Sequence, residues 1–185
     1  MLDVASAGLS VRHPKVADHG RVLTVMDTWW GGLGGKMGSQ RRALLLPRLF
    51  FQHFADTSHL VEYREGRLAA FLIGLLSQSE PSVAYIHFVG VDPALRRAGL
   101  GTWLYSRFFI EASERGARIV RCITSPGNSN SVAFHTDLGF HVDPSDLMVE
   151  GVSVQRGYDG PGLDRISFSR PLGQQPDPDG GLVSV

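Results

Sequence analysis

The N-terminal part of the chain has the spacing of apolar residues that is typical of amphipathic helices. Between Pro14 and Trp30 the spacing of the apolar residues is roughly helical, and the proline falls near the first turn, where its missing N–H is harmless. These residues are Val16, Val22, Leu23, Val25, Met26 and Trp30. Residues 39–55 repeat this spacing. Five of the eight residues at positions 31–38 are glycine, which no regular element tolerates well. The pattern therefore predicts two helices joined by a glycine-rich loop.

The rest of the chain alternates between strand and helix patterns. Residues 59–63 and 68–76 flank a Glu65-Gly66 turn, which predicts a hairpin. Residues 83–91 are nearly all apolar, which favours a central strand covered on both faces. The pattern also predicts strands over residues 118–124, 140–142, 147–154 and 165–168, and helices over residues 100–114 and 131–138. This succession of helices and strands predicts one α/β domain.

The length and the C-terminal composition set the expected domain boundary. A chain of 185 residues is the usual size of one compact domain. Residues 171–185 are rich in proline, glycine and aspartate and have little to bury. We therefore expect a domain over residues 1–170 and a disordered tail over residues 171–185.

Charge and cysteine content exclude several classes of protein. The 18 basic residues balance the 18 acidic ones, so no basic field predicts nucleic acid or an anionic membrane as a partner. The single cysteine, Cys122, excludes an internal disulfide and is more typical of a small buried hydrophobe than of a nucleophile. The N-terminus lacks the apolar core of a signal peptide, and the stretch 68–76 is too short to span a bilayer. We expect a cytoplasmic protein, and the sequence leaves a homodimer open. No metal site is expected, because five of the histidines show no His-x-x-x-His spacing, and the other two, His87 and His135, are considered below. The five are His13, His19, His53, His59 and His141.

The junction between strand 83–91 and helix 100–114 carries the most informative pattern. Glycines at positions 99 and 101 let the backbone approach a ligand, and the first amides of a helix are unpaired donors at the positive end of its dipole. This junction therefore predicts a phosphate-binding turn. A dinucleotide fingerprint would need glycine where Leu104 stands, and a P-loop would need serine or threonine after Lys36, where Met37 stands.

Two blocks of the sequence resemble the GNAT N-acetyltransferase superfamily. Val91-Asp-Pro-x-x-Arg96-Arg-Ala-Gly99-Leu-Gly101 resembles its acyl-CoA signature, Arg/Gln-x-x-Gly-x-Gly/Ala. The segment from Asn128 to Phe140 resembles the family's Asn-x(6)-Tyr-x-x-Leu-Gly-Phe block, 32 residues after Arg96. The resemblance implies a GNAT-like single domain with a central mixed, mostly antiparallel sheet, splayed at the CoA-binding strand and flanked by helices on both faces. It also implies acetyl-CoA as co-substrate and no metal.

The resemblance further implies how acetyl-CoA is held. Turn amides would bind the pyrophosphate, with added charge from Arg96. The strand edge at Val89 and Val91, splayed by a bulge at Gly90, would bond the pantetheine amides, and Asn128 would reach the same arm from the other side. Two alternatives stay open, namely that Gly90 is a packing glycine and Asn128 a helix N-cap. The implied cofactor-binding residues are Val89, Gly90, Val91, Arg96, Arg97, Ala98, Gly99, Leu100, Gly101, Thr102, Asn128 and Ser131.

Four residues are candidates for moving protons, one of them weaker than the others. His135 stands where the family usually has a tyrosine, which implies an acid for the departing CoA thiolate, although it can equally bond CoA or cap the helix. Tyr85 and His87 share one face of the predicted central strand and are candidates for the base. A core histidine satisfied by a neighbour is the alternative for His87. Glu62 is a weaker candidate, more typical of a solvent-facing charge.

The sequence says least about the acceptor substrate and the residues that bind it. In the resembling fold the N-terminal helices cover the acceptor, which implies Trp29 and Trp30 as substrate-binding residues. Adjacent tryptophans cannot both face one core from a helix, so one of them is a candidate for lining a pocket, with a staple or interface role as the alternative. The neutral charge favours a small amine or amino-acid-like acceptor, acetylated by direct attack. The alternatives are a non-catalytic acyl-CoA sensor and a protein N-terminal or lysine acetyltransferase.

Overall fold

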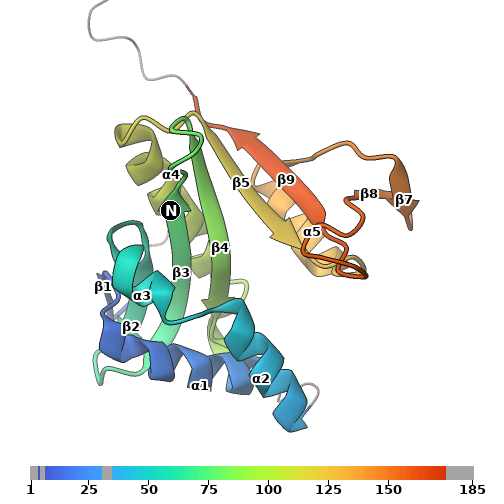
Figure 1. Ribbon diagram of the computed structural model, residues 1–185. Coiled ribbons are helices and arrows are strands. Elements are labelled where there is room, and N and C mark those ends of the chain that lie inside the picture. Colours follow the sequence, from blue (N-terminus) through green and yellow to red (C-terminus); the bar gives the residue numbers. More distant parts are fainter. Residues whose placement is uncertain (1–3, 5–6, 31–34, 174–185) are drawn as a thin grey trace, which may run out of the picture. The chain divides into compact units, whose positions relative to one another are not determined.

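The computed structural model describes Val4, residues 7–30 and residues 35–173 (Figure 1). Among these residues the expected fold class is confirmed, an α/β fold with a mostly antiparallel seven-stranded sheet. The chain forms two compact units. The first unit consists of Met1–Leu76 and Tyr85–Glu111, and the second of Ser77–Ala84 and Ala112–Val185.

The sheet of the first unit runs in the order β1 (Leu9–Arg12), β2 (His59–Tyr63), β3 (Leu68–Leu76) and β4 (Val83–Val91). β1 pairs antiparallel with β2, and β2 pairs antiparallel with β3 through the predicted hairpin. The register between β2 and β3 shifts between Val61 and Glu62. The sequence did not predict β1, because four residues are too few to establish an alternation.

The helices of the first unit depart from the predicted boundaries. The unit contains η1 (Val16–Asp18), α1 (His19–Trp29), α2 (Gly35–Leu45), α3 (Leu49–His53) and η2 (Ala55–Thr57). The long second helix predicted over 39–55 was wrong, because Pro47 has no N–H to donate and its ring obstructs the preceding turn. The glycine-rich loop was wrong for residues 35–38, which form the first turn of α2, while residues 31–34 lie outside the described part. Glycine costs only ~1 kcal/mol in a helix, which the rest of α2 can offset.

Helices cover the two faces of this sheet through alternate residues of β2 and β3. Leu60 and Phe71 lie opposite each other and belong to a core cluster with Val22 and Met26 of α1. His59 and Leu72 form the next pair, which points to the other face. There His59 bonds Glu111 of α4 (Leu100–Glu114), and a methyl group on Gly74 of β3 would strike the ring of Phe108 from the same helix. Figure 1 shows α1 and α3 in front of β3, with α4 behind it.

An ion cluster ties the N-terminal strand to the first helix. Arg12 of β1 donates to both Asp18 and Glu62, at 2.7 and 2.8 Å, and Arg21 of α1 donates to the same two carboxylates, at 2.7 and 2.9 Å. The hydrogen bond from Arg12 is the main reason that the pKa of Asp18 lies well below its usual range. The expectation of a solvent-facing Glu62 was wrong, because that residue is only 9% exposed and serves this cluster.

A buried histidine makes the stability of the first unit sensitive to acid. His59 is 1% exposed, its Nε2 lies 2.9 Å from Glu111 Oε2, and the ring of His13 is 5.2 Å away. Arg107 holds the other oxygen of Glu111 at 3.1 Å. Burial lowers the pKa of His59 to about 4, although the charge of Glu111 opposes the shift.

Acidification from about pH 6.5 to pH 4 is therefore expected to destabilise the protein through His59. In this window the unfolded chain takes up a proton that the folded chain does not, so the free energy of unfolding falls as the pH falls. Thermal melting across this range measures the effect. His59→Gln should flatten the dependence, whereas the matched variant at an exposed histidine, His53→Gln, should keep the wild-type slope. Equal slopes in all three proteins would contradict the assignment.

The second unit contains three sheet strands in the order β5 (Ile119–Thr124), β9 (Ile166–Pro171) and β6 (His141–Val142), all paired antiparallel. The helix α5 (Ser129–Asp137) follows β5. The single strand predicted over 147–154 was wrong, since β7 (Leu147–Val149) and β8 (Val152–Val154) form a hairpin. Glu150 and Gly151 between them have φ angles of 50° and 79°, the positive values that a tight two-residue hairpin turn requires.

The ordered part of the second unit reaches past the predicted tail boundary. β9 includes Pro171, and Leu172 is buried with its amide bonded to the carbonyl of Arg118 at 2.8 Å. The first two residues assigned to the tail thus belong to the fold. Residues 174–185 lie outside the described part of the chain, so disorder there stays a prediction.

Candidate active site

The backbone between β4 and α4 has the shape of an anion-binding turn. After the short helix η3 (Pro93–Leu95), Arg97 and Gly99 adopt φ angles of 64° and 84°, in the left-handed region. α4 then begins at Leu100, so the amides of its first turn have no partner within the helix. The space that a side chain on Gly99 would occupy is open, with no atom within 4 Å. Such a sequence of left-handed residues and free helix amides suits a phosphate.

Side chains of the predicted turn have different surroundings. Arg97, Ala98, Gly99 and Thr102 are exposed and Gly101 is half-buried, whereas Leu100 is 1% exposed and anchors the helix start in the core. Arg96 turns toward α1, where its Nη2 donates to the carbonyl of Trp29 at 3.0 Å. That carbonyl lies at the last residue of α1, the negative end of the helix dipole.

Strand β4 is irregular where the pantetheine edge was predicted. His87 and Phe88 are neighbours, yet His87 stacks on Phe50 of α3 at 4.1 Å and Phe88 meets Trp30 at 5.9 Å, so both contact the same helical layer. A regular strand would send neighbouring side chains to opposite faces. A methyl group on Gly90 would strike the ring of Phe71, so the alternative of a packing glycine is confirmed. The predicted bulge at Gly90, and the roles of the half-buried Val89 and Val91, stay predictions.

The structure gives His87 a specific partner. Its Nε2 donates to the carbonyl of Leu45, the last residue of α2, at 2.6 Å, which matches the alternative of a histidine satisfied by a neighbour. When Nε2 carries the proton in a neutral ring, Nδ1 is an acceptor. The ring of Tyr85 lies 6.3 Å from that of His87. The two candidates for the base therefore lie near each other on β4. Their role as base stays a prediction.

Both tryptophans at the end of α1 pack into the core cluster of the first unit. Trp29 is 8% exposed and stacks on Phe71 at 5.9 Å. Trp30 is half-buried and packs edge-on against Phe88. Adjacent tryptophans were not expected to face one core from a helix. Both reach this cluster because α1 ends at Trp29, so Trp30 leaves the helical spacing, and the placement of Trp30 within the predicted helix was wrong. Trp30 is the more accessible of the two.

In the second unit, Asn128 caps α5. Its Oδ1 accepts the amide of Ser131 at 3.2 Å, and its Nδ2 donates to Thr124 Oγ1 at 3.2 Å. The N-cap alternative is thus confirmed, and both ends of the side chain have partners. Contact of Asn128 and Ser131 with pantetheine stays a prediction.

His135 lies in the aromatic core of the second unit. It is 6% exposed, stacks on Phe168 at 4.8 Å and meets Phe140 edge-on at 5.4 Å. Its Nδ1 lies 2.7 Å from the carbonyl of Ser131, which requires a proton on that nitrogen. Burial lowers the pKa of His135, so the neutral ring predominates at neutral pH. Its role as an acid stays a prediction. Because the ring also packs in the core, a test of that role has to distinguish a loss of catalysis from a loss of stability.

The single cysteine has a thiol of low reactivity. Cys122 is 3% exposed on β5, and burial, with a smaller contribution from Asp143, raises the pKa of its thiol far above the usual value. The thiolate that a nucleophile requires is therefore scarce at neutral pH. This agrees with the expected role as a small buried hydrophobe.

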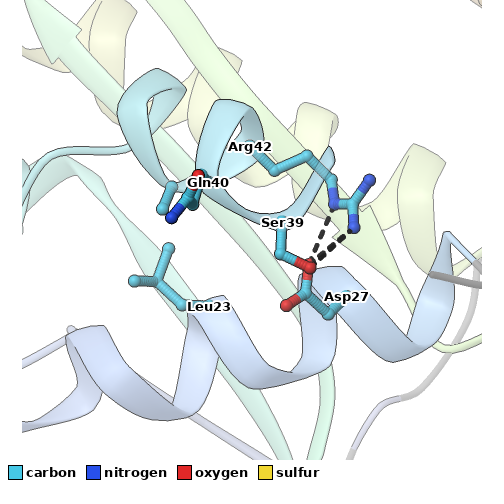
Figure 2. Close-up of a pocket in the computed structure, with 6 residues that line it drawn as sticks. Leu23, Asp27, Ser39, Gln40 and Arg42 are labelled. Atoms are coloured by element: carbon cyan, nitrogen blue, oxygen red, sulfur yellow. Dashed lines mark hydrogen bonds and ion pairs between the residues drawn. The ribbon is translucent and has the colours of Figure 1, made fainter. Parts of the chain in front are cut away.

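Each unit also has a cavity that the sequence did not predict. The cavity of the first unit, about 240 Å³, lies between α1 and α2 (Figure 2). Across it Arg42 holds Asp27 at 2.7 Å, a link that attaches α2, which has no buried residue, to α1. The cavity of the second unit, about 260 Å³, lies beside the β7–β8 hairpin and is mainly apolar, with Asn128 and Glu150 among its lining residues.

Two negative findings apply to the described residues. No three of their His, Cys, Asp and Glu side chains come together in a way that could hold a metal ion. None of the helices assigned in this part of the chain is long and apolar enough to cross a membrane.

Comparison with known proteins decides the family. Residues 29–140, more than half of the chain, match the family model described as the acetyltransferase (GNAT) family. This chain belongs to the GNAT family. Membership confirms the resemblance seen in the two sequence blocks and supports the expected class of enzyme, an acetyl-CoA-dependent acyltransferase.

Proteins similar to this GNAT protein include an N-acetyltransferase related by sequence and solved structures with the same fold. An uncharacterized N-acetyltransferase of Methanocaldococcus jannaschii is 40% identical over 58 residues, so the match covers 31% of this chain and about a quarter, 26%, of that relative. The ribosomal-protein-S18-alanine N-acetyltransferase of Escherichia coli has a similar structure, with a TM-score of 0.62, 18% identity and coverage of 92% and 97% of the two chains. The yncA protein of Salmonella typhimurium, solved with acetyl-CoA, has a TM-score of 0.61, 17% identity and coverage of 94% and 99%.

Proposed function

We propose that this GNAT protein transfers the acetyl group of acetyl-CoA to the primary amine of a small or amino-acid-like acceptor. The observation that carries the proposal is the turn before α4, where two left-handed residues and the free amides of a helix N-terminus form a cradle for a pyrophosphate. The open space beside Gly99 lets that group approach the backbone. Exposed Arg97 adds positive charge.

The remaining predicted residues are assigned to the rest of the donor. In this proposal Val89 and Val91 bond the pantetheine amides from the edge of β4, as a peptide adds to a sheet. Asn128 and Ser131 reach the same arm from the start of α5. Because the side chain of Asn128 is already engaged in the N-cap, contact with pantetheine would use its remaining lone pair or hydrogen.

The reaction is a direct transfer. The amine nitrogen attacks the thioester carbonyl carbon, the carbon–sulfur bond breaks, and CoA leaves as a thiolate that takes up a proton. The acceptor ammonium must first lose a proton to a base or to water. Tyr85 and His87 are the candidates for that base, His87 through its Nδ1 because Nε2 donates to Leu45. His135 is the residue that the sequence predicted for protonating the thiolate, and water is the alternative donor.

A small acceptor is favoured by the balanced charge of the chain, which does not demand a polycationic partner. Trp30, the more exposed of the two tryptophans, is the candidate for contacting it. The second candidate acceptor is a protein N-terminus, which the name of the similar E. coli enzyme supports. A third reading is an acyl-CoA sensor without turnover.

The proposal is tested by measuring free thiol release from acetyl-CoA with panels of small amines, amino acids and peptides that differ in their first residue. Release that depends on a small amine, with an acetylated product in the mass spectrum, is the expected result. Release with peptides alone would move the acceptor to a protein N-terminus. Tight acetyl-CoA binding without turnover on any amine would instead identify a sensor.

A further inference from the structure

A buried carboxylate stands at the start of the connection that leads from β4 to the proposed phosphate-binding turn. Asp92 follows the last residue of β4 and is 7% exposed. Its two oxygens have separate partners. Oδ1 accepts the amide of Ala94 at 3.0 Å and caps η3, while Oδ2 accepts Arg67 Nη1 at 2.7 Å and the hydroxyl of Tyr63 at 3.2 Å. The amide of Asp92 in turn donates to the carbonyl of Ala69 at 2.9 Å.

The partners of Asp92 come from a part of the fold that the acyl-CoA signature does not include. Tyr63 ends β2, and Arg67 precedes β3 on the other side of the β2–β3 turn. The guanidinium of Arg67 lies 3.8 Å from the centre of the Tyr63 ring, so stacking holds its head although the side chain is 57% exposed. The start of the phosphate turn is thereby attached to the β2–β3 hairpin by one carboxylate.

The hydrogen bonds to Asp92 also determine its ionisation state. Burial raises the pKa of Asp92, but hydrogen bonds from the amide of Ala94, from Arg67 and from Tyr63 outweigh it, so the pKa lies below its usual value and the group is ionised. An ionised carboxylate close to an incoming pyrophosphate is a like charge that weakens binding. Arg67 forms an ion pair with it and so removes most of that penalty.

We infer that Asp92, Arg67 and Tyr63 are positioning residues for the pyrophosphate of acyl-CoA. Asp92 holds the turn in its binding conformation before the ligand arrives. Arg67 neutralises the negative charge of the Asp92 carboxylate. Preforming the turn spares the ligand the cost of ordering it. The inference rests on the proposed function, because it assumes that the turn receives the pyrophosphate.

Three variants separate the tasks of the two oxygens. Asp92→Asn keeps an oxygen for the amide of Ala94 but faces Arg67 with an NH₂ group. Arg67→Gln leaves the carboxylate uncompensated, and Tyr63→Phe removes one hydroxyl. Each of the first two should raise the Kd for CoA by about tenfold, and Tyr63→Phe by about threefold, the size expected for losing hydrogen bonds to a charged group. The matched control is Glu65→Gln, which removes the exposed carboxylate 3.7 Å from Arg67 and should bind CoA as the wild type does.

The decisive readout compares two donors. With acetyl-CoA the variants should show a raised KM and a kcat within about twofold of the wild type. With S-acetylpantetheine, which lacks the pyrophosphate, kcat/KM should be unchanged. The double variant Asp92→Asn/Arg67→Gln should lose less than the product of the two single losses, because the same contact is removed twice.

Failure of the proposed function and failure of this inference give different results. A wild type that does not bind CoA would overturn the proposed function, and this inference with it. Wild-type binding with equal Kd values in Asp92→Asn, Arg67→Gln and the control would overturn the inference alone. Equal losses with both donors would also overturn it, since they would mean that the residues act on the fold or on the reacting centre rather than on the pyrophosphate.

Discussion

Thr102→Glu is expected to weaken acetyl-CoA binding roughly 100-fold, since a like charge in a binding site costs several kcal/mol and every 1.4 kcal/mol is tenfold. Thr102 is exposed in the first turn of α4, where the pyrophosphate would meet the free amides. A carboxylate there is favourable for the helix dipole, so the melting temperature should stay level or rise slightly. Calorimetric titration with acetyl-CoA measures the affinity, and a thermal melt measures the stability.

Two further variants make this result specific. Gly101→Glu tests the same turn from the neighbouring position, whereas Gly99 is unsuitable because its φ of 84° would strain any side chain. Ile110→Glu introduces the same charge further along α4, at a residue that is 59% exposed, and should bind acetyl-CoA normally. Wild-type affinity in both Thr102→Glu and Gly101→Glu would show that the turn is not the phosphate site.

His135→Ala is expected to lower the free energy of unfolding by about 3 kcal/mol, as for other large buried side chains. The imidazole contacts the rings of Phe168 and Phe140 and donates to the carbonyl of Ser131, so alanine would leave a cavity and remove one side-chain hydrogen bond. His135→Phe keeps the stacking volume and should recover most of the loss. Denaturant unfolding of the three proteins measures the difference.

The phenylalanine variant, compared with His135→Tyr, decides whether His135 is also an acid. A general acid contributes ~10² to 10⁴-fold in rate, so an acid role would cost His135→Phe at least tenfold in kcat, while His135→Tyr would retain activity. We expect the smaller effect, with kcat of the phenylalanine variant within about threefold of the wild type. The reason is that the pKa of the buried ring is lowered, and its Nδ1 proton is already donated to Ser131. A tenfold loss in the phenylalanine variant alone would establish the proton donor.

The sequence was most informative about the fold where the apolar pattern was long. The nine residues of β3 and of β4 and the fifteen of α4 lie where the pattern predicted them. Short elements carried too few positions, which is why β1 was missed and the β7–β8 hairpin was read as one strand. The Glu150-Gly151 pair was a readable turn signal within that strand. Pro47 was likewise visible as a helix breaker.

For the site, the sequence predicted backbone features better than side-chain partners. Glycine at 99 and a strand–turn–helix context were enough to locate the turn, because glycine permits the left-handed conformation that the turn adopts. The partner of Asp92 could not be found this way, since Arg67 lies 25 positions earlier and meets it only through the β2–β3 hairpin. The packing of His135 depends on Phe168, which is brought to it by β9, and no local spacing records that contact.

The burial of Cys122 has a practical consequence for spectroscopy. It is the one cysteine in the sequence, and its raised thiol pKa together with 3% exposure keeps it out of reach of maleimide reagents in the folded protein. A cysteine introduced at an exposed position such as Ala98 would then be the one reactive thiol of the folded chain. Fluorescent or spin labels can therefore be attached within the turn proposed to bind phosphate while the native cysteine is left in place.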